Sequence, residues 1–127
     1  MPTIQRYLDH PCFFVNDART DLKPDDVPST DWSEPPYVRR TERMIAVATI
    51  AEVDGEVRIR LDAGSSIDGS LIFEGEIATP SGALSITQSS REEVLRLEQL
   101  GPETFIAIGV DDLRHPQSVH VLVTKTI

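Results

Sequence analysis

Hydrophobic and polar residues alternate with a period of two along most of the chain from Met44 onward. Successive side chains of a β-strand point to opposite faces, so this pattern is typical of strands with one buried and one solvated face. The clearest run covers residues 56–62, in which Val57, Ile59 and Leu61 alternate with charged residues. Further runs, bounded by Gly, Pro, Ser or Asp, cover 71–78, 84–88, 105–110 and 118–126. The pattern therefore predicts a series of short strands.

Turn signals between these runs predict how consecutive strands pair. Asp54-Gly55 is a tight-turn dipeptide, so residues 43–52, apolar on both faces, are expected to form a hairpin with 56–62. Pro80-Ser81-Gly82 predicts a second hairpin, between 71–78 and 83–88. Residues 90–101 fit either a strand or a capped helix, and we favour a strand that forms a hairpin with 104–110. The side chains expected to face inward include Leu71, Phe73 and Ile77, and in the last strand Val119, Val121 and Val123.

The first forty residues have a different composition. They hold six of the nine prolines and five of the seven aromatic residues, whereas a disordered tail would be poor in aromatics. We predict an edge strand at 11–16, with Phe13 and Val15 on one face and Phe14 on the other. An ordered but irregular loop that Trp32 anchors is then expected at 18–36.

About eight short strands at spacings near ten residues are typical of an all-β fold, a two-layer antiparallel β-sandwich with little helix. A length of 127 residues indicates one such domain, spanning 1–127. Exposed edge strands also leave open the pairing of two copies into a homodimer.

The net charge of −9 narrows the class of partner. Sequence-independent binding to nucleic acid, or to an anionic membrane, needs clustered Lys and Arg, so neither is expected. An acidic protein is attracted instead to a basic protein, such as a nuclease, although the charge could also serve solubility alone. A single cysteine, Cys12, and the lack of an apolar leader or spanning segment fit a bacterial cytoplasm.

No residue pattern predicts catalysis. No nucleophile motif surrounds Cys12, His10 and His115 each precede a proline, and His120 lies within the last predicted strand. Glu74 and Glu76 share one strand face and could bind a divalent ion, but solvated surface charge is the simpler interpretation. We therefore expect a protein that is not an enzyme, with no catalytic residues, no cofactor and no metal.

The N-terminal segment supplies the candidate binding residues. Carboxylates would imitate phosphates against a basic cleft while aromatic side chains anchor the interface. The carboxylates are Asp25, Asp26, Asp31 and Glu34, and the anchors are Trp32 and Tyr37. Alternatively, Trp32 closes one open end of the sandwich.

A small-ligand sensor is a second hypothesis. The segment 39–43, with Arg39, Arg40 and Arg43, followed by a loop with Ser66 and Gly69, resembles the cyclic-di-GMP motif of PilZ domains. In that motif the arginines would clamp phosphates bidentately. Gly64 departs from the motif because it stands where an acidic or amide residue belongs.

Several landmarks along the chain together resemble the competence protein J family, small inhibitors of a DNA-uptake nuclease. They are the aromatic strand 12–15, the Asp31-Trp32 pair, the strand end 58–61, the segment 73–77, the turn 79–82, and 94–97 followed by the turn 101–103. The resemblance implies an all-β inhibitor whose acidic surface masks a nuclease, and it marks no contact residues.

Overall fold

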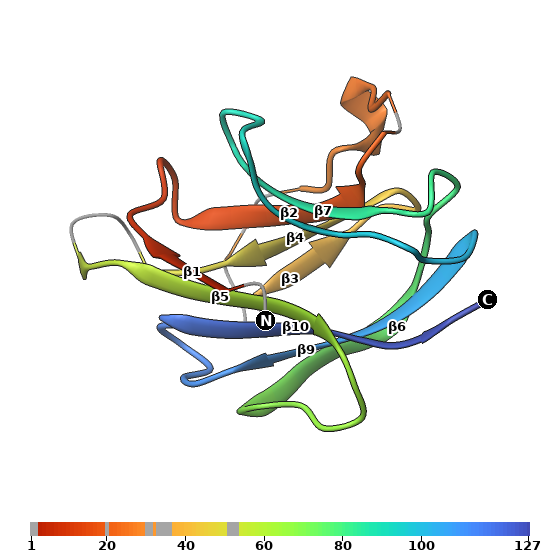
Figure 1. Cartoon of the computed structure of the whole chain (residues 1–127). Coiled ribbons are helices and arrows are strands. Elements are labelled where there is room, and N and C mark those ends of the chain that lie inside the picture. Colours follow the sequence, from red (N-terminus) through yellow and green to blue (C-terminus); the bar gives the residue numbers. More distant parts are fainter. Residues whose placement is uncertain (1–2, 20, 30–31, 33–36, 51–53) are drawn as a thin grey trace.

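The computed structural model describes residues 3–19, 21–29, 32, 37–50 and 54–127, and it consists of two five-stranded sheets packed face to face (Figure 1). Sheet A has the order β1 (Thr3–Arg6), β5 (Val57–Ala63), β10 (Ser118–Thr126), β9 (Glu103–Val110) and β6 (Ser70–Ala78). Sheet B has the order β3 (Val38–Arg40), β4 (Met44–Ala48), β2 (Cys12–Asp17), β7 (Leu84–Gln88) and β8 (Glu93–Leu97). The helical part of the described chain is one short 3-10 turn, Pro24–Asp26. The predicted all-β, two-layer sandwich is confirmed, with short β1 and β3 in addition to the predicted strands.

The core between the sheets follows the alternation in the sequence. Val119, Val121 and Val123 of β10 point into it, as predicted. From sheet B, Phe13 and Val15 point into the same core, whereas Phe14 lies on the outer face in a second apolar cluster. The buried side of β2 and of β10 was therefore predicted correctly.

The three predicted hairpins are wrong. β4 and β5 lie in different sheets, and so do β6 and β7, and β8 and β9. A turn sequence fixes a local change of chain direction, and a crossing between layers needs such a change as much as a hairpin does. The antiparallel neighbours that follow one another along the chain are instead β3 with β4, β7 with β8, and β9 with β10.

Two of the connections that cross between the sheets, β6–β7 and β8–β9, are joined to each other by hydrogen bonds. The Leu100 amide donates to the Gly82 carbonyl at 2.9 Å, and the Thr79 amide donates to the Pro102 carbonyl at 2.9 Å. The Thr79 hydroxyl also donates to the Gly101 carbonyl at 2.6 Å. The backbone groups that a hairpin would have paired are thus satisfied between the two crossings.

The strand predicted at 11–16 is present as β2, but its predicted position at a sheet edge is wrong, because β2 lies in the middle of sheet B between β4 and β7. All six of its residues are buried, which is typical of a strand covered on both faces. In sheet A, β10 lies between β9, which is antiparallel to it, and β5, which is parallel to it. That parallel pair departs from the antiparallel arrangement that the sequence predicted.

Two further predictions concern single elements. Residues 93–97 form a strand, β8, so the strand interpretation of 90–101 is confirmed. Leu71, predicted to face inward, is 50% exposed because the register between β6 and β9 shifts between Leu71 and Phe73. The extra residue, Ile72, packs against the core in its place.

The connection between β5 and β6 lies across the outer face of sheet A. A Cβ atom on Gly109 of β9 would collide with the Asp68 carbonyl, so glycine is required where the connection crosses the strand. Gly69 ends the crossing at φ +83°, a conformation that favours glycine. The connection is thus fastened to the sheet.

Candidate functional site

The N-terminal segment that the sequence singled out covers the outer face of sheet B. Asp31 and Glu34 lie outside the described residues, so four of the six candidate binding residues can be placed: Asp25, Asp26, Trp32 and Tyr37. The two aspartates lie in the 3-10 turn Pro24–Asp26, which stands out from the sheet at the upper right of Figure 1.

The two aspartates of this turn differ in what they can offer a partner. Asp26 accepts the backbone N–H of Lys23 at 2.8 Å and lies 3.8 Å from the Arg43 guanidinium, so its carboxylate stabilises the turn. The Thr41 hydroxyl donates to the carbonyl of Asp26. Asp25 is exposed and has no such contact within the described chain. Asp25 is therefore the carboxylate of this turn that is directed to solvent.

Trp32 packs on the outer face of sheet B. It contacts a cluster whose buried members include Cys12, Phe14 and Met44. The Arg39 guanidinium lies over the indole ring, 5.7 Å from its centroid, a cation–π arrangement. The interpretation of Trp32 as closing an open end of the sandwich is thus wrong, because the ring covers a sheet face. Tyr37 lies alongside, and its carbonyl accepts the Ala48 amide at 3.0 Å.

Cys12 lies beneath this segment as a buried thiol. Burial, and then the nearby charge of Asp9, raise the pKa of Cys12 above its ordinary value. Thiolate is the reactive form of cysteine, so a raised pKa makes the side chain a poor nucleophile at neutral pH. Its surroundings are apolar, as expected of a cysteine that serves packing.

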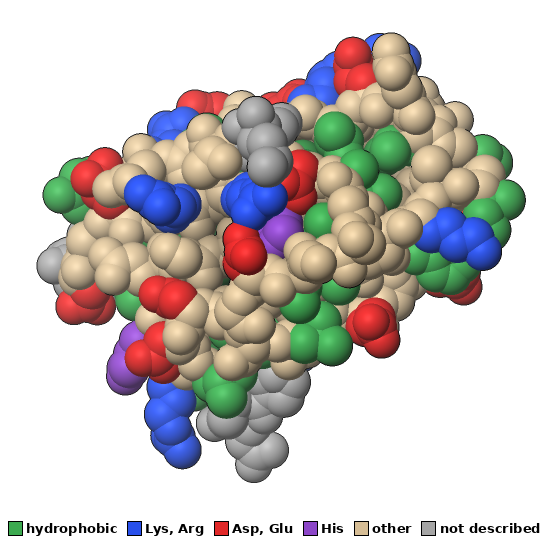
Figure 2. Space-filling view, turned by 60° about the horizontal axis from the view of Figure 1, so that its bottom comes forward, with side chains coloured by type: hydrophobic (Ala, Val, Ile, Leu, Met, Phe, Trp, Pro, Cys, Tyr) green, Lys and Arg blue, Asp and Glu red, His purple; other side chains and the backbone are tan. Residues whose placement is uncertain are grey.

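A buried polar network on the outer face of sheet A was not predicted from the sequence. His120 of β10 lies 2.7 Å through Nε2 from Oδ1 of Asp62 on β5, and Arg60 donates through Nε to the other Asp62 oxygen at 2.7 Å. Arg60 also reaches Asp68, whose backbone N–H donates to His120 Nδ1 at 3.0 Å. Figure 2 shows a histidine framed by arginine and carboxylate side chains on this side of the molecule.

The geometry of this network fixes the protonation of its members. Because Nδ1 of His120 accepts the Asp68 amide, the ring proton is on Nε2 and is donated to Asp62. Burial alone would raise the pKa of Asp62, but the hydrogen bonds from His120 and Arg60 outweigh it and lower that pKa. Both ring nitrogens are engaged, so His120 has none available as a general base. The arrangement fastens the β5–β6 connection to the sheet.

The carboxylates of β6 have a neighbour that the sequence did not reveal. Glu76 lies beside Glu103, at the start of β9, and a hydrogen bond with Glu76 together with its negative charge raises the pKa of Glu103. Protonation of Glu103 removes one of two neighbouring negative charges and allows its hydrogen bond with Glu76. Within the described residues, no three His, Cys, Asp or Glu side chains are grouped to hold a metal ion.

The five residues of the PilZ-like hypothesis are divided between the β3–β4 hairpin of sheet B and the β5–β6 connection over sheet A. Arg40 lies over Phe73 at 5.7 Å and donates to the Glu76 carbonyl at 2.9 Å, linking the edges of the two sheets. Arg39 and Arg43 have the contacts with Trp32 and Asp26 described above. Ser66 and Gly69 belong to the β5–β6 connection, at the bottom of Figure 1. No described contact joins the arginines to that connection, and the hypothesis stays a prediction.

None of the helical segments in the described part of the chain has the length and apolarity needed to cross a membrane.

Comparisons with known proteins identify solved structures that share this architecture. No protein-family model matches the chain, and no curated protein matches it significantly in sequence. Among solved structures it is similar to ComJ, inhibitor of the DNA degrading activity of NucA, from Bacillus subtilis, with a TM-score of 0.67 and 9% identity over 100% of this chain and 96% of ComJ. The product of crocagin biosynthetic gene J is also similar, with a TM-score of 0.51 and 11% identity over 96% of this chain and 93% of the other. The resemblance inferred from sequence landmarks is thus confirmed at the level of architecture, and the chain has the fold of ComJ.

Proposed function

We propose that this protein is a non-enzymatic protein-binding module that inhibits a basic partner, such as a nuclease, by covering its active cleft. The observation that carries the proposal is the likeness of its whole length to ComJ, whose described role is inhibition of a nuclease. The net charge of −9 supports it, since nucleases are commonly basic where they hold phosphate. We place its action in the cytoplasm of a bacterium.

The proposed contact surface is the N-terminal segment over sheet B. Asp25 is exposed there, and Trp32 presents an indole held between Arg39 and the apolar cluster of sheet B. A pre-positioned aromatic ring limits the entropy lost on binding, which is one reason such rings dominate interface energies. Asp31, Glu34 and Tyr37 complete the proposed surface, while Asp26 stabilises its turn.

The experiment is an inhibition assay with the nuclease encoded beside this protein, or with a basic enzyme that the protein captures from its source cell and that is then purified. Increasing amounts of the protein are added, and degradation of plasmid DNA is measured. We expect inhibition that saturates near one protein per nuclease. Asp25→Lys should weaken the inhibition at least tenfold, whereas Glu74→Lys, an equal charge change on β6 of the other sheet, should not.

Two outcomes would contradict the proposal. Full nuclease activity at a large excess of the protein would contradict inhibition. Equal inhibition by both charge-reversed variants would contradict the proposed surface and leave overall charge as the only electrostatic contribution. Circular dichroism and a melting curve for each variant ensure that a loss of inhibition is not a loss of fold.

A further inference from the structure

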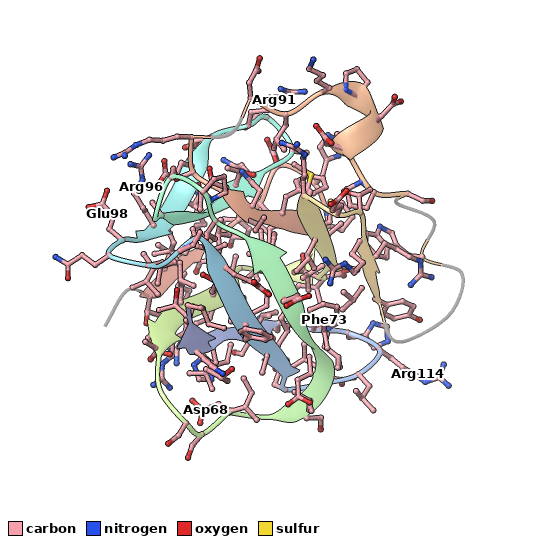
Figure 3. The ribbon with its side chains drawn as sticks, turned by 90° about the vertical axis from the view of Figure 1, so that its right-hand side faces the viewer. Asp68, Phe73, Arg91, Arg96, Glu98 and Arg114 are labelled. Carbon is pink, nitrogen blue, oxygen red and sulfur yellow. The ribbon has the colours of Figure 1, made fainter. Side chains whose placement is uncertain are left out.

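The polar network on the outer face of sheet A places a buried histidine against a loop that crosses the sheet. His120 is 3% exposed, and its ring lies between β5 and the β5–β6 connection. Figure 3 shows Asp68 on this connection, at the lower end of the molecule. A cavity of about 260 Å³ lies against the ring, so protons from solvent have a route to it. A titratable group is thus in direct contact with the segment that it holds.

The two ring nitrogens of His120 have opposite roles. Nε2 carries the ring proton and donates it to the Asp62 carboxylate at 2.7 Å. Nδ1 carries no proton and accepts the backbone N–H of Asp68 at 3.0 Å. A protonated imidazole is a donor at both nitrogens and has no acceptor left. Protonation of His120 is therefore incompatible with the present place of the Asp68 amide, because two N–H groups would face each other.

The groups around the ring carry more negative than positive charge. Asp62 of β5 stays ionised in mildly acidic solution, since its pKa is lowered. The Asp68 carboxylate lies 3.9 Å from Nδ1 of the ring, close enough to become the acceptor of an N–H there. Arg60 is the cation of the network, and it is bonded to both of these carboxylates. Arg58 and Asp111, which line the same cavity, carry opposite charges. Burial disfavours a charged ring, whereas the two carboxylates of the network favour it.

The connection is also held at its two ends. At its start the Gly64 amide donates to the Val123 carbonyl at 3.1 Å. At its end the carbonyl of Asp68 rests on Gly109 of β9, where a Cβ atom would collide with it. Loss of the bond from the Asp68 amide should therefore release the segment 65–67, which is largely exposed, and leave both ends in place.

We propose that the contact between His120 and the β5–β6 connection is a pH-sensitive switch, closed when the ring is neutral and open when the ring is protonated. On opening, the ring takes up one proton from solvent at Nδ1, and the Asp68 carboxylate replaces the Asp68 amide as the partner of that nitrogen. The bond to Asp62 stays in place. Histidine ordinarily changes its charge between about pH 5 and pH 8, so mild acidification opens the switch. The inference concerns the sheet opposite the proposed contact surface and does not depend on the nuclease.

The experiment is NMR on the wild-type protein labelled with ¹⁵N, at pH values from about 8 to about 5. At the upper value, a scalar coupling through the N–H···N hydrogen bond should connect the Asp68 amide nitrogen with Nδ1 of His120. We expect this coupling to disappear on acidification, while the Nδ1 chemical shift moves to that of a protonated ring. Over the same range, the protection of the Asp68 amide against hydrogen exchange, corrected for the intrinsic rate, should fall about tenfold or more.

Three variants separate the switch from a general effect of acid. His120→Gln can still donate to Asp62 but has no basic nitrogen, so the corrected exchange of the amides 65–68 should no longer depend on pH. His115→Gln is the matched control and should respond as the wild type does, because His115 is exposed and lies outside the network. Asp68→Asn should move the titration of the ring to lower pH, because an amide then stands where the new N–H needs a carboxylate.

Several results would overturn the proposal. They are a ring that is still neutral at about pH 5, an Asp68 amide that stays protected after the ring is protonated, and the same pH response in His120→Gln as in the wild type. The first two are measured on the wild-type protein, so the test holds even if His120→Gln does not fold. An unchanged titration of the ring in Asp68→Asn would overturn the exchange of amide for carboxylate.

Discussion

Replacing Asp62 by asparagine tests how much the buried network on sheet A contributes to stability. The side chain keeps its shape but loses its charge. Its amide oxygen can still accept the His120 proton, but its amide group then points an N–H at the N–H of Arg60, which lies 2.7 Å away in the wild type. The carboxylate is buried, with Asp62 7% exposed, so solvent does little to replace the lost bond. Asp68 remains as a partner for Arg60.

The expected cost follows from these bonds. One hydrogen bond between charged groups, worth about 1.5–3 kcal/mol, is lost and a second is weakened, so the free energy of unfolding should fall by about 2–4 kcal/mol. With an unfolding entropy of about 2.1 cal/mol/K per residue, a chain of 127 residues should lose about 7–15 °C in melting temperature. Urea unfolding at pH 7 measures the first quantity and calorimetry the second, with Asp25→Asn as an exposed control that should change neither.

The pH dependence of the same variant is a sharper test. The pKa of Asp62 is lowered in the folded protein, so the folded state binds this proton less tightly than the unfolded state. The stabilisation is therefore complete above the unfolded pKa, about 3.9, and is lost as the pH falls through the folded value. Asparagine lacks this titration, so the stability difference between wild type and variant should shrink below about pH 4. If Asp62→Asn had the same urea midpoint as the wild type at pH 7, the reasoning would be refuted. A stability difference between the two proteins that stayed the same in acid would refute it as well.

Three further predictions concern other parts of the molecule. Gly109→Ala should push the β5–β6 connection off sheet A and cost about 1–3 kcal/mol in urea unfolding, whereas at Gly64 an added Cβ meets only ordinary contact and alanine should be tolerated. Limited proteolysis should then cleave the connection in the Gly109 variant alone. Cys12 should react with iodoacetamide at pH 7 only as fast as the protein unfolds, measured by mass spectrometry, and rapid labelling of the native state would contradict its burial. Glu76→Gln should lower the pKa of Glu103 in an NMR titration, because the neighbouring negative charge is removed, and an unchanged value would show that the two carboxyl groups do not interact.

The sequence predicted eight of the strands and the buried side of most of them, because a period of two is a local property, but it missed β1 and β3 and the register shift at Leu71. The inward positions of β10 and the opposite faces of Phe13 and Phe14 follow from it directly. It did not predict which strands pair. The same turn signals serve a hairpin and a crossing between sheets, and the choice depends on contacts between distant parts of the chain.

The functional surfaces were predictable to a similar extent. Composition indicated the aromatic and acidic segment, and the structure places Trp32 on the outer face of sheet B. The network of Asp62 and His120 was beyond prediction, because it needs β5 to lie parallel to β10 and brings together two residues that are 58 positions apart in the chain.

The position of β10 in the middle of sheet A constrains the order of events when the chain is made. The ribosome adds this strand after the other nine, yet β5 and β9 are joined only through it. Until β10 is synthesised, β5 and β9 each expose an unpaired edge, the kind of surface from which aggregation starts. Sheet A can therefore close only after β10 has been made, and shortening the chain before residue 118 should leave two separate pieces of sheet rather than a slightly smaller closed layer.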